Sequence, residues 1–134
     1  MERASKGYRT GDFSVNERLK SFRHAFRGIA TLVRFEQNAW IHMTLLVIVI
    51  VAGLLFKISL TDWIAIIVVS GLVLASECFN TSIEYLSDTI TTQTNENIMK
   101  AKDVAAAGVM ISALAALITG LIIFIPEILK LLRR

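Results

Sequence analysis

The sequence contains little cysteine, proline or glycine. One cysteine, Cys78, and one proline occur in 134 residues, together with seven glycines. A single cysteine excludes an internal disulfide framework, and Cys78 is expected to be a small apolar filler. The scattered glycines contain no GxxxxGK[ST] motif, so a P-loop or a Rossmann nucleotide site is excluded. Any nucleotide site must therefore be of another kind.

Charged residues are also sparse, because hydrophobic residues make up 54% of the chain. The mean hydropathy is +0.61. A soluble domain of this length could not hide so much apolar surface. The composition therefore predicts a membrane protein that forms one domain, residues 1–134. No cleavable signal peptide is expected, because the first long apolar run begins only near Ala39.

Three windows of the sequence contain no charged residue. The windows 37–56 and 104–126 are each long enough to cross a hydrocarbon core of about 30 Å as a helix. The window 63–76 is too short alone, and it can span only if its helix continues through ECFNTSIE. A re-entrant or interfacial segment is the alternative, but the short link KISLTD favours a tight turn between two antiparallel helices. We therefore expect an all-α integral membrane protein with transmembrane helices at 37–57, 62–86 and 98–126.

Basic residues gather at the N-terminal end, where eight of the 14 Lys and Arg residues lie in the first 34 positions. This distribution favours anionic lipid headgroups over nucleic acid as the partner. Placing the N-terminus and the link 86–103 in the cytoplasm puts Lys100 and Lys102 on the same side as those eight. The positive-inside rule favours this orientation, although the C-terminal KLLRR opposes it.

Two segments precede the first span. Residues 1–13 are expected to be a flexible polar tail, and residues 14–35 a basic amphipathic helix with an apolar stripe. Ser14 and Glu17 have the spacing of a capping box at the start of this helix. Such a helix lies in the membrane surface or packs on other protein, and both can hold together.

Four polar residues, Glu77, Asn80, Glu84 and Asp88, share one helical face at the end of the short window. At about 100° per residue they fall within about 80° of one another. Fifteen residues from Asp62 carry Glu77 about 22 Å inward, several ångströms below the inner edge of the hydrocarbon core. Glu84 then reaches the interface, and Asp88 lies among the headgroups.

A second polar group is expected at the same depth. Glu36 marks the inner end of the first span, and Lys102 and Asp103 mark the inner end of the third. The run 105–108 consists of small residues that let helices approach closely. Three spans can therefore bring these residues to the polar face that begins at Glu77. His24 and His42 are expected to be interfacial or packing residues rather than metal ligands.

Carboxylates at this density repel one another unless a cation lies among them. Mg²⁺ takes one or two carboxylates together with phosphate oxygens and waters, and a lysine binds a phosphate as a point charge. A partly desolvated carboxylate that is not bound to the metal can take a proton from a hydroxyl group. These parts fit phosphoryl transfer, with Glu77 as the base. Polar stripes on membrane helices also line proton or cation paths, so an ion-coupled transporter is a second hypothesis for the function.

The motif ECFNTSIEYLSD, followed by KAKDVAAAGV, resembles the signature of the small bacterial membrane lipid kinases, the diacylglycerol kinase and undecaprenol kinase family. SFRHAFRGI and FEQNAWIH extend the similarity to residues 19–125. The resemblance implies a homotrimer of three-span subunits with an amphipathic surface helix in the bacterial cytoplasmic (inner) membrane. It also implies transfer of the γ-phosphoryl group of Mg·ATP to a lipid alcohol at the cytoplasmic face, with no nucleic-acid partner.

The resemblance also assigns roles to residues by their position in the motifs. Glu77 resembles the catalytic base, and Glu36 and Glu84 resemble the metal-coordinating carboxylates. Residues that match positions associated with the nucleotide and its phosphates are Asn80, Lys102 and Asp103, with Asp88 at the cytosolic edge of the site and Arg18, Lys20 and Arg23 as weaker matches. The form E-x-N-x-x-I-H at 36–42 resembles the undecaprenol kinase branch, so undecaprenol is the expected substrate and diacylglycerol the alternative.

Overall fold

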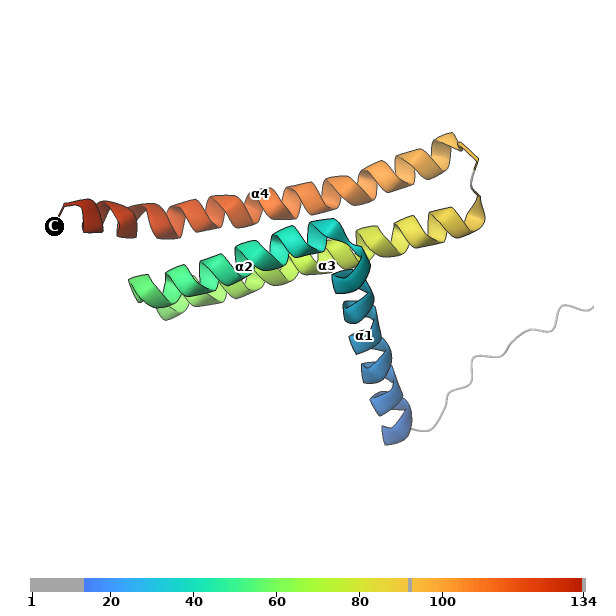
Figure 1. Cartoon of the computed structure of the whole chain (residues 1–134), viewed down its shortest axis with the longest axis horizontal. Helices are drawn as coiled ribbons and strands as arrows, with labels where there is room; N and C mark the ends of the chain where they lie inside the picture. Colours follow the sequence, from blue (N-terminus) through green and yellow to red (C-terminus); the bar gives the residue numbers. More distant parts are fainter. Residues whose placement is uncertain (1–13, 92, 134) are drawn as a thin grey trace, which may run out of the picture.

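The computed structural model describes residues 14–91 and 93–133, and all regular secondary structure in this part of the chain is α-helical. The helices are α1 (Val15–Phe35), α2 (Gln37–Phe56), α3 (Leu60–Ile90) and α4 (Glu96–Leu132). Figure 1 shows α3 and α4 as a long antiparallel hairpin, with α2 packed along α3 and α1 pointing away from these three helices. The flexible tail predicted for residues 1–13 lies outside the described residues.

Three of the described helices, α2, α3 and α4, are long and apolar enough to cross a membrane. This confirms the prediction of an all-helical chain with three candidate membrane-spanning helices. The helix α3 runs without interruption for 31 residues from Leu60 to Ile90, through the whole of ECFNTSIE. The re-entrant alternative for the short window is therefore wrong.

The junction between α1 and α2 lies at Glu36. Its backbone is extended (φ −100°, ψ 115°), and its N–H donates to the carbonyl oxygen of Leu32 as α1 ends. The chain therefore changes direction at Glu36 and places this residue at the N-terminus of α2. At the other end of α1, the Ser14 hydroxyl accepts a 3.4 Å hydrogen bond from the Glu17 N–H, which is one of the two bonds of the expected capping box.

The turn between α2 and α3 is tight, as the link KISLTD predicts. Lys57 adopts the left-handed conformation (φ 53°) that ends α2, and Ser59 and Asp62 form a complete capping box that begins α3. The ring of Trp63 lies directly against Gly53, where a Cβ atom would come within 2.8 Å of the ring. Gly53 therefore allows the two helices to meet closely beside the turn.

The predicted spans differ from the observed helices at their ends. Helix α2 stops one residue earlier than expected, because Lys57 is left-handed. Helices α3 and α4 extend further at both ends, to 60–90 and 96–132 instead of 62–86 and 98–126. Charges mark where a helix leaves the hydrocarbon core, but the backbone ladder continues beyond that point. Pro126 does not end α4, since a proline removes a single backbone donor from the helix.

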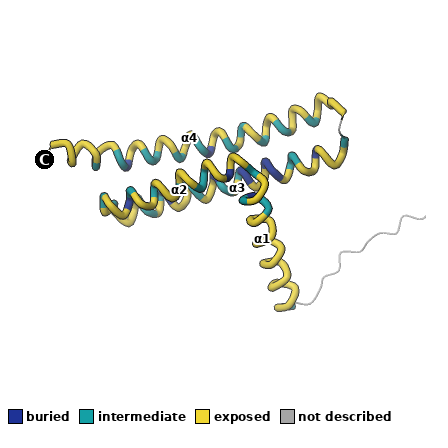
Figure 2. Tube along the Cα trace, viewed as in Figure 1, coloured by how far each residue is buried: buried dark blue, intermediate teal, exposed yellow. Residues whose placement is uncertain are grey.

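Few side chains are buried in the described part of the chain, and Figure 2 shows mostly exposed residues along all four helices. The buried apolar residues are Leu32, Ala39, Ile66, Val73 and Ile123. An equal number of buried residues is polar: Glu77, Asn80, Thr81, Ser87 and Ser112. Exposed apolar residues need no explanation in a membrane protein, whereas buried polar residues do, and four of these five lie in α3.

Candidate active site

Glu77 is the most deeply buried large side chain among the described residues, with 1% of its surface exposed. Its Oε1 atom lies 3.0 Å from Nε2 of His42 on α2. The contact is short, but its geometry is not that of a hydrogen bond, so Oε1 has no hydrogen-bond partner. Burying a carboxylate without full compensation is costly, which indicates that this position serves a function.

The contact between His42 and Glu77 was missed by sequence reasoning, which treated His42 as an interfacial or packing residue. Helices α2 and α3 are antiparallel and joined by a short turn. When a residue of α2 and a residue of α3 lie at the same level, their two residue numbers therefore add up to a nearly constant value. His42 and Glu77 sum to 119, and Glu36 and Glu84 sum to 120. This spacing could have placed His42 at the level of Glu77, since each residue of helix rises about 1.5 Å.

Asn80 and Glu84 continue the polar face of α3 from Glu77. The Asn80 side chain is 7% exposed, and its Nδ2 donates a 2.9 Å hydrogen bond to Oε1 of Glu84. The carbonyl oxygen of Asn80 and the hydroxyl of Thr81 are buried without a hydrogen-bond partner among the described residues. The structure therefore brings Asn80 and Glu84 into direct contact, and it places the buried hydroxyl of Thr81 next to Asn80 in the sequence of the same helix.

Glu36 joins this face from the junction between α1 and α2. The charges of Glu36 and Glu84 both act on the Glu77 carboxyl and on the hydroxyl of Tyr85. As the residue before α2, Glu36 makes no side-chain capping bond with that helix. Its carboxylate interacts instead with the hydroxyl of Tyr85, and we define the acidic cluster as Glu36, Glu77 and Glu84.

Lys102 reaches the same face from α4. Its Nζ lies 3.1 Å from Oδ1 of Asp88, at the end of α3 that faces away from the α2–α3 turn. Both side chains are at least one-third exposed, so this ion pair is accessible to other ligands. Asp103 is exposed, and its side chain makes no hydrogen bond or ion pair with another described residue. The structure thus brings Lys102 to the polar face but leaves Asp103 outside its contacts.

The small residues at 105–108 were expected to let helices approach closely. Within the chain, a Cβ atom added at Gly108 would meet nothing within 4 Å. The expected close approach is therefore not made at Gly108, which lies on an exposed part of α4.

The residues of this site fit a magnesium ion that arrives with a nucleotide. The described residues contain no group of three or more His, Cys, Asp and Glu side chains placed to hold a metal ion alone. Magnesium does not need such a group, because it takes one or two carboxylates and completes its shell with phosphate oxygens and waters. Glu36 and Glu84 offer the carboxylates, and the carbonyl oxygen of Asn80 is a buried acceptor without a partner.

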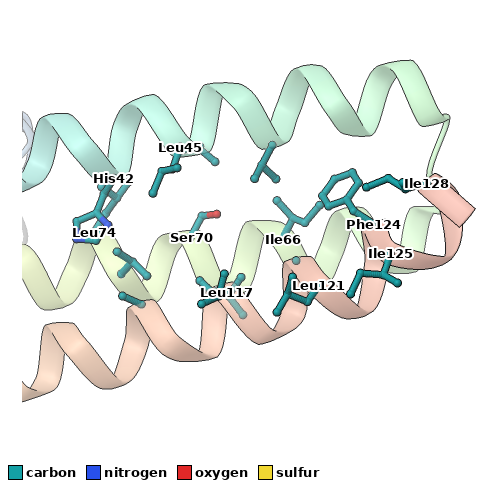
Figure 3. A pocket seen from close by; sticks show the side chains of 17 residues that line it. His42, Leu45, Ile66, Ser70, Leu74, Leu117, Leu121, Phe124, Ile125 and Ile128 are labelled. Carbon is teal, nitrogen blue, oxygen red and sulfur yellow. The ribbon is translucent and has the colours of Figure 1, made fainter.

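An apolar groove of about 360 Å³ runs between α2, α3 and α4. Figure 3 shows His42 at one end of it and Ile128 at the other, with the Ser70 hydroxyl between them. Its remaining lining is apolar, with small residues of α4 such as Ala113 and Gly120 on one side. The groove therefore ends at the imidazole that contacts the buried carboxylate of Glu77.

The fold and the site define a membrane protein in which the buried carboxylate of Glu77 contacts the histidine at the end of an apolar groove, with the half-buried carboxylates of Glu36 and Glu84 nearby. A comparison with protein families matches residues 23–124 to the family described as prokaryotic diacylglycerol kinase, and the chain belongs to this family. Membership confirms the resemblance that the motifs predict, and it makes the protein a phosphotransferase of the lipid kinase class. A kinase of this family uses a nucleotide co-substrate.

Two curated relatives support the same assignment. The chain is 36% identical over 114 residues to an undecaprenol kinase of Bacillus subtilis, covering 85% of this chain and 93% of the relative. It is 33% identical over 115 residues to a diacylglycerol kinase of Synechocystis, covering 85% of this chain and 66% of that protein. These relationships favour phosphoryl transfer over ion transport as the use of the polar face.

Proposed function

We propose that this protein is an ATP- and Mg²⁺-dependent lipid kinase that phosphorylates undecaprenol at the cytoplasmic face of the bacterial inner membrane. The whole chain then forms a single lipid-kinase domain. The observation that carries the proposal is the buried carboxylate of Glu77, which lies between an apolar groove and a polar face with a lysine. Phosphorylation of a lipid alcohol needs both an apolar and a polar region, because the lipid chain is apolar and the nucleotide that donates the phosphate is charged.

In this proposal Glu77 is the general base that removes the proton from the lipid hydroxyl. A buried carboxylate is suited to this step, because it has few competing partners and lies at the depth of a lipid hydroxyl. A lipid chain in the apolar groove would bring its hydroxyl group to the end lined by His42, next to Glu77. The groove therefore supports Glu77 as the catalytic residue.

The other polar residues would bind the nucleotide. Glu36 and Glu84 would hold the magnesium ion, which neutralises charge on the phosphates when bound. Asn80 would bind beside them, and Lys102 would exchange its partner Asp88 for a phosphate oxygen. Asp103 would reach the nucleotide from the exposed start of α4.

Undecaprenol is the proposed substrate for two reasons. The E-x-N-x-x-I-H form at 36–42, which ends at His42, resembles that of the undecaprenol kinase branch. The relative named undecaprenol kinase is also matched over nearly its whole length, 93%, compared with 66% for the diacylglycerol kinase. Diacylglycerol, phosphorylated to phosphatidic acid, is the alternative substrate within the same reaction class.

We also propose a homotrimer in which α1 lies on the membrane surface. Large apolar side chains on the outward faces of α2 and α4 are exposed in the single chain, which leaves them for lipid or for other subunits. In α1 the exposed residues Leu19, Phe22 and Phe26 lie among basic side chains, a pattern that suits the membrane interface. The direction of α1, away from the three spans, agrees with this placement (Figure 1).

The substitution Glu77→Gln tests the proposed base directly. The amide keeps the shape of the side chain but cannot accept the proton, so we expect kcat to fall about 10²- to 10⁴-fold or further. The affinity for Mg·ATP, measured by calorimetry on the purified protein, should stay within about threefold of wild type, because Glu77 makes no phosphate contact in this proposal. Equal losses of binding and turnover would contradict the role of Glu77 as the base.

A further inference from the structure

The family motifs assign a role to Glu77 but none to His42. The contact between these two side chains indicates a role for the histidine as well. Oε1 of Glu77 lies 3.0 Å from His42 Nε2, and among the described residues it is one of three buried side-chain atoms without a hydrogen-bond partner. The two side chains are 19% and 2% exposed. In the described part of the chain, the imidazole of His42 is therefore the polar group that contacts this carboxylate oxygen.

Two further carboxylates act on Glu77, which increases the importance of its contact with His42. The acidic side chains whose charges reach Glu77 are Glu36, from the junction before α2, and Glu84, from α3 itself. Both repel a second negative charge, whereas the N–H group of His42 attracts it. His42 is thus the group on the facing helix that can hold the carboxylate of Glu77 in one orientation.

His42 also lies at the end of the apolar groove, and Glu77 does not line that groove. An alcohol that enters along the groove meets the imidazole edge first and the carboxylate behind it. If His42 Nε2–H holds Oε1, the second oxygen, Oε2, is left to receive the proton of the alcohol. The orientation of the carboxylate then decides whether that oxygen points toward the incoming hydroxyl.

We propose that His42 is a positioning residue that fixes the Glu77 carboxylate through Oε1 and leaves Oε2 to take the proton of the lipid hydroxyl. The inference rests on the proposed function of Glu77. In the step itself, the proton moves from the hydroxyl to Oε2 while the hydroxyl oxygen bonds to the γ-phosphorus. The bond from that phosphorus to the β–γ bridging oxygen breaks, and ADP leaves with the electron pair.

The test compares His42→Leu with His42→Gln in vesicles that contain a lipid alcohol. Leucine fills the space without a donor, whereas glutamine places an N–H group at nearly the reach of Nε2. We expect kcat to fall about tenfold to hundredfold in His42→Leu, since a misplaced catalytic group costs this much. In His42→Gln it should stay within about fivefold of wild type. KM for ATP should change less than about twofold in both variants.

The matched control is His24→Leu, which removes an exposed histidine of α1 and should leave kcat unchanged. Helix content and thermal unfolding are measured for each variant, and His42→Asn, with a shorter reach, should resemble His42→Leu. Full activity of His42→Leu would overturn the inference. So would equal losses in His42→Leu and His42→Gln, because the side chain would then serve packing alone.

Wild type and Glu77→Gln in the same assay separate this inference from the proposed function. If wild type phosphorylates the alcohol and Glu77→Gln does not, a fully active His42→Leu contradicts the inference alone. If wild type phosphorylates no lipid alcohol, the proposed function fails and the inference fails with it. If Glu77→Gln turns over like wild type, the proposed role of Glu77 as the base fails, and the inference again fails with it.

Discussion

At the scale of single residues, the site is notable for polar atoms that are buried and incompletely paired. Glu77 Oε1, Asn80 Oδ1 and Thr81 Oγ1 all lack a hydrogen-bond partner within the described chain. Oε1 of Glu77 faces His42 Nε2 at 3.0 Å, whereas the side-chain oxygens of Asn80 and Thr81 have no such neighbour among the described residues. Native proteins satisfy most buried polar atoms, so these two oxygens indicate a place where a ligand completes the bonding. The hydrogen bond from Asn80 to Glu84 shows that the same face is otherwise ordered.

The substitution Glu84→Gln tests the metal role at this scale. The amide keeps an acceptor oxygen for Asn80 but removes the charge that would bind Mg²⁺, so the Mg²⁺ concentration for half-maximal activity should rise about tenfold or more. Activity measured across a magnesium titration reports this value. Glu96→Gln is the matched control, because Glu96 is exposed and pairs with Lys100 one turn away. An unchanged magnesium requirement in Glu84→Gln would contradict metal coordination by this residue.

At the scale of helices, the long continuous α3 is the element that builds the site. It begins at the Ser59–Asp62 capping box and carries Glu77, Asn80, Glu84 and Asp88 along one face. Helix α2 supplies His42 from one side, and α4 supplies Lys102 from the other. The level of His42 relative to Glu77 depends on the turn between α2 and α3, where Gly53 and Trp63 are in close contact.

The substitution Gly53→Ala should therefore loosen this helix pair. The new Cβ atom would lie 2.8 Å from one ring carbon of Trp63 and 3.0 Å from Cδ1 of Ile58, so the ring has to move. We expect a destabilisation of about 1–3 kcal/mol, measured as a lower thermal unfolding temperature of the detergent-solubilised protein. Gly71→Ala is the control, since a Cβ there meets nothing within 4 Å. Equal unfolding temperatures for the two variants would contradict the packing role of Gly53.

Sequence reasoning found the elements better than their ends or their contacts. The missing length of the window 63–76 predicted that α3 continues past Glu77, because a helix has to cover the thickness of the membrane. Helices α3 and α4 were predicted too short at both ends, since charges report the membrane boundary and not the end of the hydrogen-bond ladder. The partner of Glu77 was missed, because periodicity places a residue on a face of its own helix without saying which side chain of another helix it meets.

At the scale of the whole molecule, an apolar groove and a polar helix face meet at His42 and Glu77. The apolar groove between the three spans leads to His42 and Glu77, and beyond them the polar face of α3 continues to the ion pair of Asp88 and Lys102. A lipid alcohol and a nucleotide can meet only where these two surroundings join. In the proposed orientation, which follows the positive-inside rule, this junction lies on the cytoplasmic side, where the proposed co-substrate ATP is supplied.

The most direct test of the proposed lipid kinase activity measures phosphate transfer by the purified wild-type protein in lipid vesicles. Radiolabelled γ-phosphate of ATP is supplied with Mg²⁺, and separate vesicles contain undecaprenol, diacylglycerol or a simple long-chain alcohol. We expect labelled undecaprenyl phosphate as the main product, formed only with magnesium, and little label in the other lipids. Label mainly in phosphatidic acid would contradict undecaprenol as the substrate. No labelled lipid in any vesicle would contradict the proposal of an ATP-dependent lipid kinase.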